Sequence, residues 1–270
     1  MIQNDYHDEC CRLCASKNIA NVFSSKLVHK YIVSYYKCSD CGLLFTEKPY
    51  WLEEVNRDPV SLFDTGIVAR NLSISKRLPI ILKIVYGTKN KFVDYAGGNG
   101  LLVRLMRDIG FDYEWHDIYA TNLFSRGFEW NQRNEVKAMS AIECFEHFPD
   151  PAKNIHDLFK ISKNIIFTTE ILPQPVPSKK WWYYAFERGG HVAFYERKTL
   201  EYLASKYSVS YHSFYGFHIL TGEDISKTKK LLCKSIRFIP LLPAMFLKME
   251  VSRTWSDYQY IRKKKGSYNG

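Results

Sequence analysis

The sequence predicts an α/β fold with a doubly wound, Rossmann-like sheet and a small metal-binding module at the amino terminus. Two observations predict it. Residues 91–119 read as an apolar strand, a glycine turn, an amphipathic helix and a second strand, which is a β-α-β unit. Two C-x-x-C pairs lie within the first 41 residues. We therefore expect the module over residues 1–50, a helical linker region over 51–90 and the main domain over 91–270.

The four paired cysteines have the spacing of a zinc site. Cys11 and Cys14 form one pair, and Cys38 and Cys41 form the other. Four thiolates in two such turns can surround one zinc ion tetrahedrally and leave no open position for catalysis, so we expect a structural ion. A run from Tyr31 to Tyr36 predicts a strand before the second pair. Cys10 could replace Cys11 as a ligand, and a redox pair or unrelated thiols are the alternatives.

The composition is that of an ordinary globular protein with excess positive charge. The chain has 270 residues, 46% hydrophobic and 24% charged, with a net charge of +10. That charge favours anionic partners: nucleic acid, phosphorylated substrates or an anionic membrane surface. The alternative is dispersed surface charge with a basic tail, because much of the excess lies in "SKTKK" and "IRKKK".

The sequence contains neither an apparent signal peptide nor a stretch of about 18 apolar residues. We expect a cytoplasmic, reduced protein without structural disulfides. The most apolar late segment, "IRFIPLLPAMFLKM", is interrupted by Pro240 and Pro243. We expect a packed element there, with peripheral contact to a membrane surface as the alternative.

The glycine turn is flanked by regular elements. Residues 70–87 read as a helix that ends at Gly87, and "KFVDYA" reads as a buried strand. After "GGNG", the segment "LLVRLMRDIG" has helical periodicity, and "FDYEWHDIY" reads as the next strand. This is the context that a nucleotide-binding loop requires.

The loop fits a dinucleotide poorly and a cationic cofactor well. The fingerprint G-x-G-x-x-G fails because Val103 stands at its third glycine position. Asp94 at the end of the strand would repel a pyrophosphate but would attract a ligand with ammonium and sulfonium groups. Asp117 lies 23 residues further on, where a carboxylate can accept hydrogen bonds from ribose hydroxyls.

These residues resemble the loop D-x-G-x-G-x-G of class I S-adenosylmethionine-dependent methyltransferases. Here the motif runs from Asp94 to Gly100, with Ala96 in place of the first glycine. The resemblance implies a methyltransferase fold and S-adenosylmethionine as cofactor. The cofactor-binding residues that it implies are Asp94, Ala96, Gly97, Gly98, Asn99, Gly100, Asp117, Ile118, Ile142 and Glu143.

Later segments extend the resemblance. "EVKAMSAIECFEHFPDP" is similar to the family's fourth strand and its loop, through Glu143, Glu146 and His147, and "KNIIFTTE" is similar to the fifth strand. The cysteine pairs together with "WWYYAFERGGHVAFYERKTLEYLA" resemble bacterial methyltransferases of sugar and glycan pathways. This implies a sugar acceptor, nucleotide-linked or lipid-linked, methylated on a hydroxyl or a carbon.

Methyl transfer to a hydroxyl gains from a general base, for which histidine is the usual choice. His191 and His147 are the candidates, with Glu187 and Tyr184 as helpers. His147 could instead be structural, and Glu143, Glu146 and His147 could hold a divalent ion. The aromatic block of residues 181–184 could stack on sugar rings or bases, or pack against the sheet.

Three other functions compete with this interpretation. A nucleic-acid methyltransferase fits the charge, the aromatic residues and the zinc knuckle, but "IECFEHF" lacks the Pro-Pro-aromatic turn of enzymes that act on base amino groups. A non-catalytic zinc-knuckle scaffold would explain the module, but the intact Asp94, Gly98, Gly100 and Asp117 argue against it. A dehydrogenase is opposed by Val103 and Asp94.

Overall fold

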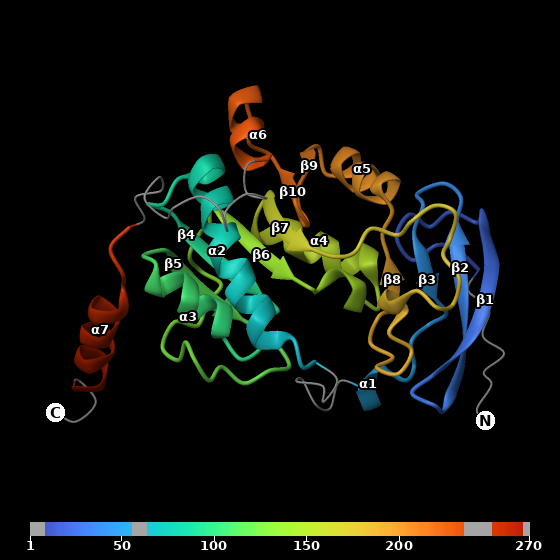
Figure 1. Ribbon diagram of the computed structural model, residues 1–270, viewed down its shortest axis with the longest axis horizontal. Coiled ribbons are helices and arrows are strands. Elements are labelled where there is room, and N and C mark those ends of the chain that lie inside the picture. Colours follow the sequence, from blue (N-terminus) through green and yellow to red (C-terminus); the bar gives the residue numbers. More distant parts are fainter. Residues whose placement is uncertain (1–8, 56–63, 235–249, 267–270) are drawn as a thin grey trace. The chain divides into compact units, whose positions relative to one another are not determined.

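The computed structural model describes residues 9–55, 64–234 and 250–266 (Figure 1). Their contacts divide the chain into two compact units. Unit 1 comprises residues 1–63 and 141–222, and unit 2 comprises residues 64–140 and 223–270. The domain ranges expected from the sequence, 1–50, 51–90 and 91–270, describe parts that would fold independently. These ranges stay a prediction.

Unit 1 contains an antiparallel sheet that begins at the cysteine pairs. Its strand order is β1-β2-β3-β8, with the following bounds: β1 Ile19–Leu27, β2 Tyr31–Cys38, β3 Leu44–Thr46 and β8 Ala193–Phe194. The strand expected from Tyr31 onward is present as β2, where buried and half-buried residues alternate over its first four positions. The short strand β8, far along the chain, pairs with β3 of the amino-terminal sheet, where Phe194 lies opposite Leu44.

Aromatic side chains fill the core of this part of unit 1. Phe23 stacks on Tyr35 with ring centroids 4.5 Å apart, and Tyr184 stacks on Phe186 at 5.2 Å. Trp51, at the start of α1 (Leu52–Val55), donates from Nε1 to the carbonyl of Gly189 at 2.8 Å. The high aromatic content of the sequence is therefore used largely for packing in this unit.

The remainder of unit 1 holds three antiparallel strands and two longer helices. The strands are β7 Asn164–Thr168, β10 Phe217–Thr221 and β9 Ser210–Phe214, in the order β7-β10-β9. The helices are α4 Pro151–Ile161 and α5 Arg197–Lys206. Asp150 caps α4 by accepting from the Lys153 amide, and proline at the first helical position suits that start. Two short 3-10 turns, η1 Phe145–His147 and η2 Trp182–Tyr184, complete the unit.

Unit 2 contains the parallel strands expected of a β-α-β unit. The order is β5-β4-β6, with β4 Lys91–Tyr95, β5 Asp112–His116 and β6 Ala138–Ile142. The last two residues of β6 are counted in unit 1. The helices are α2 Ile67–Tyr86, α3 Leu101–Asp108, α6 Lys227–Lys234 and α7 Thr254–Gly266. Leu102, Val103 and Met106 form the buried stripe of α3.

The expected α/β class is confirmed, with strands of both directions. The expected helices before and after the glycine turn are α2 and α3, and "KNIIFTTE" contains β7. The segment "IRFIPLLPAMFLKM", for which we weighed membrane contact, lies outside the described residues. Within the described ranges, the structure has no helix whose length and hydropathy would let it cross a membrane.

A buried ion pair attaches α7 to the rest of unit 2. The Arg107 guanidinium donates to both carboxylate oxygens of Asp257, at 2.8 and 2.7 Å, and to the carbonyl of Tyr113 at 2.8 Å. The side chains of Arg107 and Asp257 are only 3% and 6% exposed. Phe128 covers the guanidinium at 3.8 Å from its ring centroid.

We expect Arg107→Met to lower the free energy of unfolding by about 3 kcal/mol, because it leaves a buried carboxylate without its main partner. Arg104 still faces Asp257 at 3.0 Å, which limits the loss. Urea denaturation measures the change. The control is Arg197→Met, since the Arg197–Glu201 pair is 76% and 53% exposed and its loss should cost less than about 1 kcal/mol. Equal losses in both variants would contradict the analysis.

Candidate functional site

The glycine loop between β4 and α3 has left-handed backbone at alternate positions. The φ angles are 56° at Ala96, 53° at Gly98 and 82° at Gly100. A Cβ on Gly100 would lie 2.5 Å from the Ser125 hydroxyl and 2.6 Å from the Asn122 side chain, so this position also needs glycine for space. A loop with this backbone and few side chains can lie in close contact with a ligand. Ala96 has the same left-handed conformation but carries a Cβ, so its backbone is strained.

Asp94 lies at the carboxyl end of β4 and is 3% exposed. Ser140 donates a short hydrogen bond from its hydroxyl to Oδ1 of Asp94. Burial raises the pKa of Asp94 to about 7, the Ser140 hydrogen bond lowers it, and the charge of Asp117 raises it further. The protein thus buries an acidic group beside the loop without supplying a basic partner from these contacts.

Asp117 follows β5 and connects the end of that strand to the glycine loop. Its Oδ2 accepts from the Gly98 amide at 2.9 Å, and its Oδ1 accepts from the amides of Tyr119 and Ala120 at 2.7 and 2.8 Å. Trp115 adds a second connection by donating from Nε1 to the Gly98 carbonyl at 2.8 Å. The structure therefore brings together Asp94, the loop and Asp117 in unit 2, as the sequence suggested.

Asn99 gives a further polar group in the loop. Its carbonyl accepts from the amides of Leu123 and Phe124 at 3.0 and 3.1 Å. Its side-chain Oδ1 is buried and has no hydrogen-bond partner among the described residues. Ile118, which the resemblance implied as a cofactor-binding residue next to Asp117, is 71% exposed. A buried acid, an acceptor that lacks a donor and a glycine backbone fit a cofactor that carries positive charge and hydrogen-bond donors.

Glu143, predicted for cofactor binding, lies in unit 1 just after β6. Its Oε1 accepts from the Thr168 hydroxyl at 2.6 Å, and its amide donates to the same hydroxyl at 3.0 Å. The residue has a positive φ of 49°, so the chain turns sharply after β6. Ile142 is half-buried at the end of the strand. The hydrogen bonds therefore hold Glu143 at the end of β7.

Glu146, His147 and His191 form a compact cluster in unit 1. One ligand atom from each lies within 4.8 Å of the others. Glu146 is fully buried, His191 is 7% exposed, and the exposed His147 gives the cluster a side that faces solvent. The turn η1 that carries Glu146 and His147 is held in place by Phe145, which stacks on Phe167 at 4.0 Å.

Backbone carbonyls orient both imidazoles. Nδ1 of His191 lies 2.7 Å from the Tyr183 carbonyl, and Nδ1 of His147 lies 2.9 Å from the Gly190 carbonyl. A carbonyl only accepts, so each Nδ1 carries a proton. Burial lowers the pKa of His191 to about 3, and the nearby His147 lowers it further.

The acidic member of the cluster is shifted in the opposite direction. Burial raises the pKa of Glu146 to about 8, and the charge of Glu143 adds to this rise. Tyr183 and Thr169 act weakly the other way, but neither completes a hydrogen bond of normal geometry to the carboxyl group. A buried acid and a buried imidazole whose pKa values are displaced in opposite directions are typical of a functional site.

The other predicted catalytic residues lie outside this cluster. Tyr184 is fully buried, and its hydroxyl donates to the Pro177 carbonyl at 3.0 Å. Glu187 is exposed. In the aromatic block, Tyr183 is buried too, whereas Trp182 is 71% exposed. Roles for Tyr184 and Glu187 in catalysis stay predictions.

The four predicted cysteines converge in unit 1. One sulfur from each of Cys11, Cys14, Cys38 and Cys41 lies within 4.8 Å of the others. The Cys11–Cys41 and Cys14–Cys38 sulfur pairs are both 3.6 Å apart. Tetrahedral zinc with Zn–S bonds of about 2.3 Å requires sulfurs about 3.8 Å apart, so the spacing fits. Cys10 is not in the group, which favours Cys11 as the ligand.

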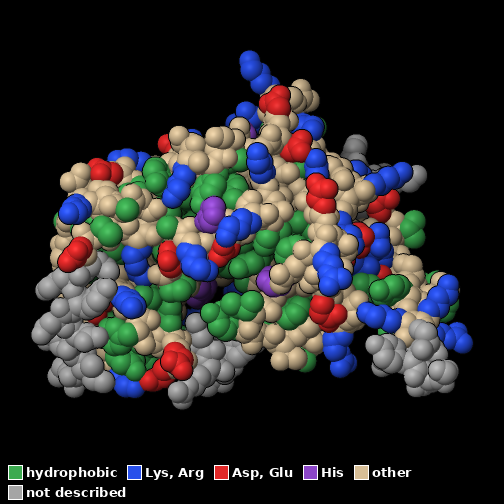
Figure 2. Space-filling model, turned by 180° about the vertical axis from the view of Figure 1, so that it is seen from behind, with side chains coloured by type: hydrophobic (Ala, Val, Ile, Leu, Met, Phe, Trp, Pro, Cys, Tyr) green, Lys and Arg blue, Asp and Glu red, His purple; other side chains and the backbone are tan. Residues whose placement is uncertain are grey.

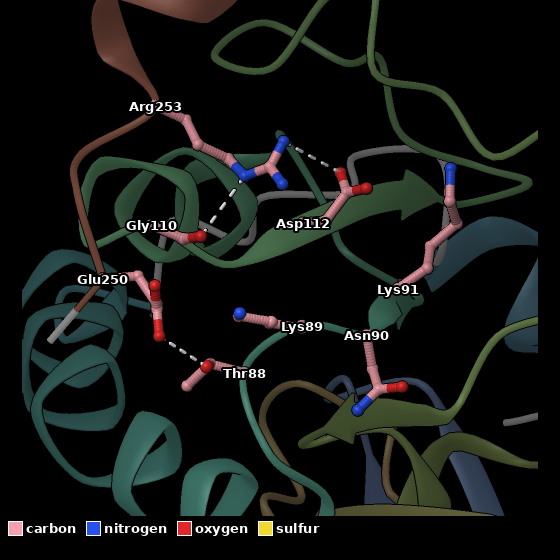
Figure 3. Close-up of a pocket in the computed structure, with 8 residues that line it drawn as sticks. All are labelled: Thr88, Lys89, Asn90, Lys91, Gly110, Asp112, Glu250 and Arg253. Atoms are coloured by element: carbon pink, nitrogen blue, oxygen red, sulfur yellow. Dashed lines mark hydrogen bonds and ion pairs between the residues drawn. The ribbon is translucent and has the colours of Figure 1, made fainter.

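A cavity of about 440 Å³ lies elsewhere in unit 2 (Figure 3). Its lining includes Lys89 and Lys91 before and in β4, and Glu250 and Arg253 from the segment before α7. It is therefore at the amino end of β4, whereas the glycine loop follows the carboxyl end. Figure 3 shows Arg253 directed at Asp112 and at the Gly110 carbonyl, contacts that tie the late segment to unit 2. Ligands of doubly wound folds bind at the carboxyl ends, so we do not assign the cofactor here.

Several residues of these sites escaped the sequence analysis. Ser140 faces Asp94 because the two lie in register on parallel strands. Gly190 is close to His147, since a Cβ there would lie 3.2 Å from the imidazole. Strand pairing could have suggested Ser140, and the glycine pair before His191 could have suggested a close approach, whereas the Tyr183 carbonyl carries no sequence signal.

Ala96 allows a direct test of the loop. We expect Ala96→Gly to raise the free energy of unfolding by about 0.5 kcal/mol, since relief of about 1–2 kcal/mol of left-handed strain exceeds the entropy that glycine adds to the unfolded chain. The matched variant is Gly98→Ala, which has open space around its Cβ and should lose about 1 kcal/mol from backbone strain alone. Chemical denaturation measures both. A loss in Ala96→Gly would show that the loop differs from this description.

The chain was compared with known proteins. A family model described as "Methyltransferase domain" matches residues 70–208, which is more than half of the chain. This range includes the glycine loop, both aspartates and the Glu146–His147–His191 cluster. No curated protein matches the chain.

Solved structures resemble the chain only distantly. An O-methyltransferase family 2 protein from Planctomyces limnophilus, in complex with apigenin, is 10% identical with a TM-score of 0.44, covering 59% of this chain and 60% of its own. An O-methyltransferase family protein from Burkholderia thailandensis is 16% identical with a TM-score of 0.41, covering 66% and 68%. Magnesium protoporphyrin IX methyltransferase from Synechocystis, with bound SAH, is 11% identical with a TM-score of 0.42, covering 63% and 90%.

The chain thus spans about 60% of the length of the first of these structures. The family match over residues 70–208 decides the assignment. The chain belongs to the methyltransferase domain family.

Proposed function

We propose that the chain is an S-adenosylmethionine-dependent methyltransferase that acts on a small-molecule acceptor. Within the family match, the observation that carries the proposal is the buried Asp94 beside a left-handed glycine loop. A carboxylate that burial would otherwise disfavour becomes stable when a cationic ligand binds next to it. S-Adenosylmethionine has both an ammonium and a sulfonium group.

Unit 2 supplies the groups that would hold this cofactor. Asp94 would face the positive charge of the cofactor, and the loop backbone from Ala96 to Gly100 would contact the cofactor closely. Asp117 would accept hydrogen bonds from the ribose hydroxyls, which would replace some of the backbone amides that donate to it now. When bound, the cofactor supplies an electrophilic methyl group for an in-line displacement. The contribution of the protein is therefore to position the acceptor and to exclude water.

Unit 1 supplies the groups that we propose for the acceptor. His191 and His147 each bring a ring nitrogen into a cluster that also holds a buried carboxyl group, and backbone carbonyls orient both rings. Such a cluster suits a hydroxyl group that must lose its proton. The exposed Trp182 offers a flat face of the kind that stacks on a sugar ring, which supports a sugar or glycan precursor as acceptor.

Charge does not single out nucleic acid as the acceptor. On the face in Figure 2, Lys and Arg side chains alternate with Asp and Glu side chains and do not form one continuous patch. A small phosphorylated acceptor, such as a nucleotide-linked or lipid-linked sugar, matches dispersed positive charge better. We also propose a reducing, cytoplasmic location, in keeping with the free thiols of the described cysteines.

We further propose that Cys11, Cys14, Cys38 and Cys41 hold one structural zinc ion. The sulfur spacing supports it, as does the position of the cysteines before β1 and around the end of β2. Such an ion would fasten the two turns on which the amino-terminal sheet is built. With four protein ligands it has no open position, so its role is to stabilise unit 1.

Cofactor affinity should depend on pH through Asp94. The carboxyl group, with a pKa of about 7 in the free protein, must ionise to hold a cation, so affinity should be roughly tenfold higher at about pH 7.5 than at about pH 6. Calorimetric titration with S-adenosylmethionine measures the Kd at each pH. Asp94→Asn should bind at least about tenfold more weakly at the higher pH and lose most of the pH dependence.

Two further results make this test specific. Asp157→Asn, at a half-buried position on α4, should bind like the wild type. Without cofactor, the folded wild-type protein binds the Asp94 proton more tightly than the unfolded chain does, so this group should lower the free energy of unfolding as pH rises from about 4 to about 7. Asp94→Asn should lack that part of the decline. The absence of any cofactor binding by wild type would overturn the proposed function.

The zinc proposal is tested by a pair of neighbouring cysteines. Cys11→Ser should lose one zinc equivalent and unfold more readily, because three thiolates hold zinc less tightly than four. Cys10→Ser, whose sulfur lies outside the cluster, should keep both the metal and the stability. Metal analysis by mass spectrometry and thermal unfolding with and without chelator measure the two effects. Zinc retained in Cys11→Ser and lost in Cys10→Ser would reassign the ligand.

A further inference from the structure

We infer that Glu146, His147 and His191 form a second metal site in unit 1, which takes a divalent transition-metal ion of the zinc class. The site is separate from the four cysteines and contains different donor atoms. Among the residues that we weighed in the sequence for an ion, Glu146 and His147 are members, but Glu143 is bonded to Thr168 and His191 takes its place.

The two histidines already have the arrangement of metal ligands. In metal sites a ligating histidine usually donates its second ring N–H to a carbonyl or carboxylate, which fixes the ring and presents the other nitrogen. Here the carbonyls of Tyr183 and Gly190 receive the Nδ1 protons at 2.7 and 2.9 Å. These bonds fix both rings, and one ring nitrogen of each histidine lies within 4.8 Å of the other ligand atoms of the cluster.

Glu146 supplies the independent observation that a ligand is missing. It is 0% exposed, and neither carboxylate oxygen has a hydrogen-bond partner in the described structure. The nearby hydroxyls of Thr169 and Tyr183 bond to each other at 3.0 Å. A buried carboxyl group without partners is costly, and a metal ion is one of the few species that would compensate both oxygens at once.

The spacing requires only small side-chain movements. The three ligand atoms lie within 4.8 Å of one another, and bonds of about 2.0–2.2 Å to a tetrahedral ion would bring them to about 3.4 Å. A backbone hydrogen bond joins the two segments that carry the ligands, since the Val192 amide donates to the Glu146 carbonyl at 2.8 Å. His147 also lies directly against Gly190, where a Cβ would be 3.2 Å from its ring.

The donor set selects the class of ion. Two neutral imidazoles and one carboxylate suit Zn²⁺, Co²⁺, Fe²⁺ or Mn²⁺, whereas Mg²⁺ and Ca²⁺ prefer sites made of oxygen. Three protein ligands leave at least one position open, and the exposed side of His147 provides access from solvent. An oxygen atom of the acceptor could occupy that position and lose its proton more readily. This last role rests on the proposed function, whereas metal binding does not.

The alternative is a metal-free cluster in which the histidines exchange protons with the acceptor. In that case Glu146 should bond to an imidazole, as acids that orient catalytic histidines do. The structure shows instead that Glu146 bonds to neither ring, although all three groups converge. A shared cation explains the convergence and the missing bonds together.

Metal stoichiometry tests the site without cofactor or acceptor. The 270-residue chain is incubated with excess ZnCl₂, freed of unbound ion by gel filtration and analysed by mass spectrometry. We expect about two zinc ions per chain for the wild type, one for the four cysteines and one for this cluster. His191→Ala and the isosteric Glu146→Gln should each retain about one. The exposed His156→Ala is the control and should retain two.

A graded variant and a spectroscopic probe complete the test. Gly190→Ala should push on His147 and weaken the second ion by about 10–100-fold, the usual effect of disturbing a group that supports a ligand. Co²⁺ added to protein that holds one zinc should give visible d–d bands without thiolate charge-transfer bands, and His191→Ala should abolish them. MgCl₂ should not compete.

The results decide between the two interpretations. One zinc per chain in the wild type, or two in both His191→Ala and Glu146→Gln, would overturn the second site. If cofactor binding by calorimetry also failed, the proposed function would fall separately, since neither metal count requires cofactor. Variants that bind S-adenosylmethionine like the wild type are folded, so a lost ion in them reports the site itself.

Discussion

Four cysteine sulfurs held within 4.8 Å of one another are the constraint on which unit 1 depends. As thiolates they would repel one another, and the zinc ion that we propose would remove that repulsion at the end of the amino-terminal sheet. From there β2 pairs with β3, and β3 pairs with β8, next to the segment that carries His191. Lys37, beside the second cysteine pair, forms an ion pair with the buried Glu196 at the start of α5. Strands β2, β3 and β8 thus connect the cysteine turns to the segment that carries His191, which we assign to the acceptor.

A different electrostatic problem organises unit 2. Asp94 is buried beside a loop whose backbone is strained at Ala96, and its neighbour Ser140 offers only one hydrogen bond. In the free protein this arrangement is unfavourable for the ionised carboxyl group. Sites that bind a charged ligand commonly store such a cost and recover it on binding. The buried acid is therefore better explained by the ligand than by the fold.

Local sequence patterns predicted the elements around the loop because each is encoded within a few residues. The apolar stretch before Asp94, the glycines and the periodicity of α3 all act over short distances, and the cysteine spacing does so too. The convergence of His191 with Glu146 and His147 could not be predicted, since about 45 residues separate them and the Tyr183 carbonyl that orients His191 is invisible in a sequence. The same holds for the division into two units, each of which contains two separate stretches of chain.

The two-residue strand β8 would couple ligand binding at the cysteines to ligand binding at the histidine cluster. Ala193 and Phe194 pair with β3, so they connect the cysteine turns to the segment that carries His191. A ligand that rigidifies one of these two parts would therefore raise the affinity of the other part for its own ligand. In the language of linkage, the cysteine-bound ion would be a heterotropic effector of acceptor binding, and the coupling would be reciprocal. An acceptor in place would then tighten the binding of an ion to which it makes no contact.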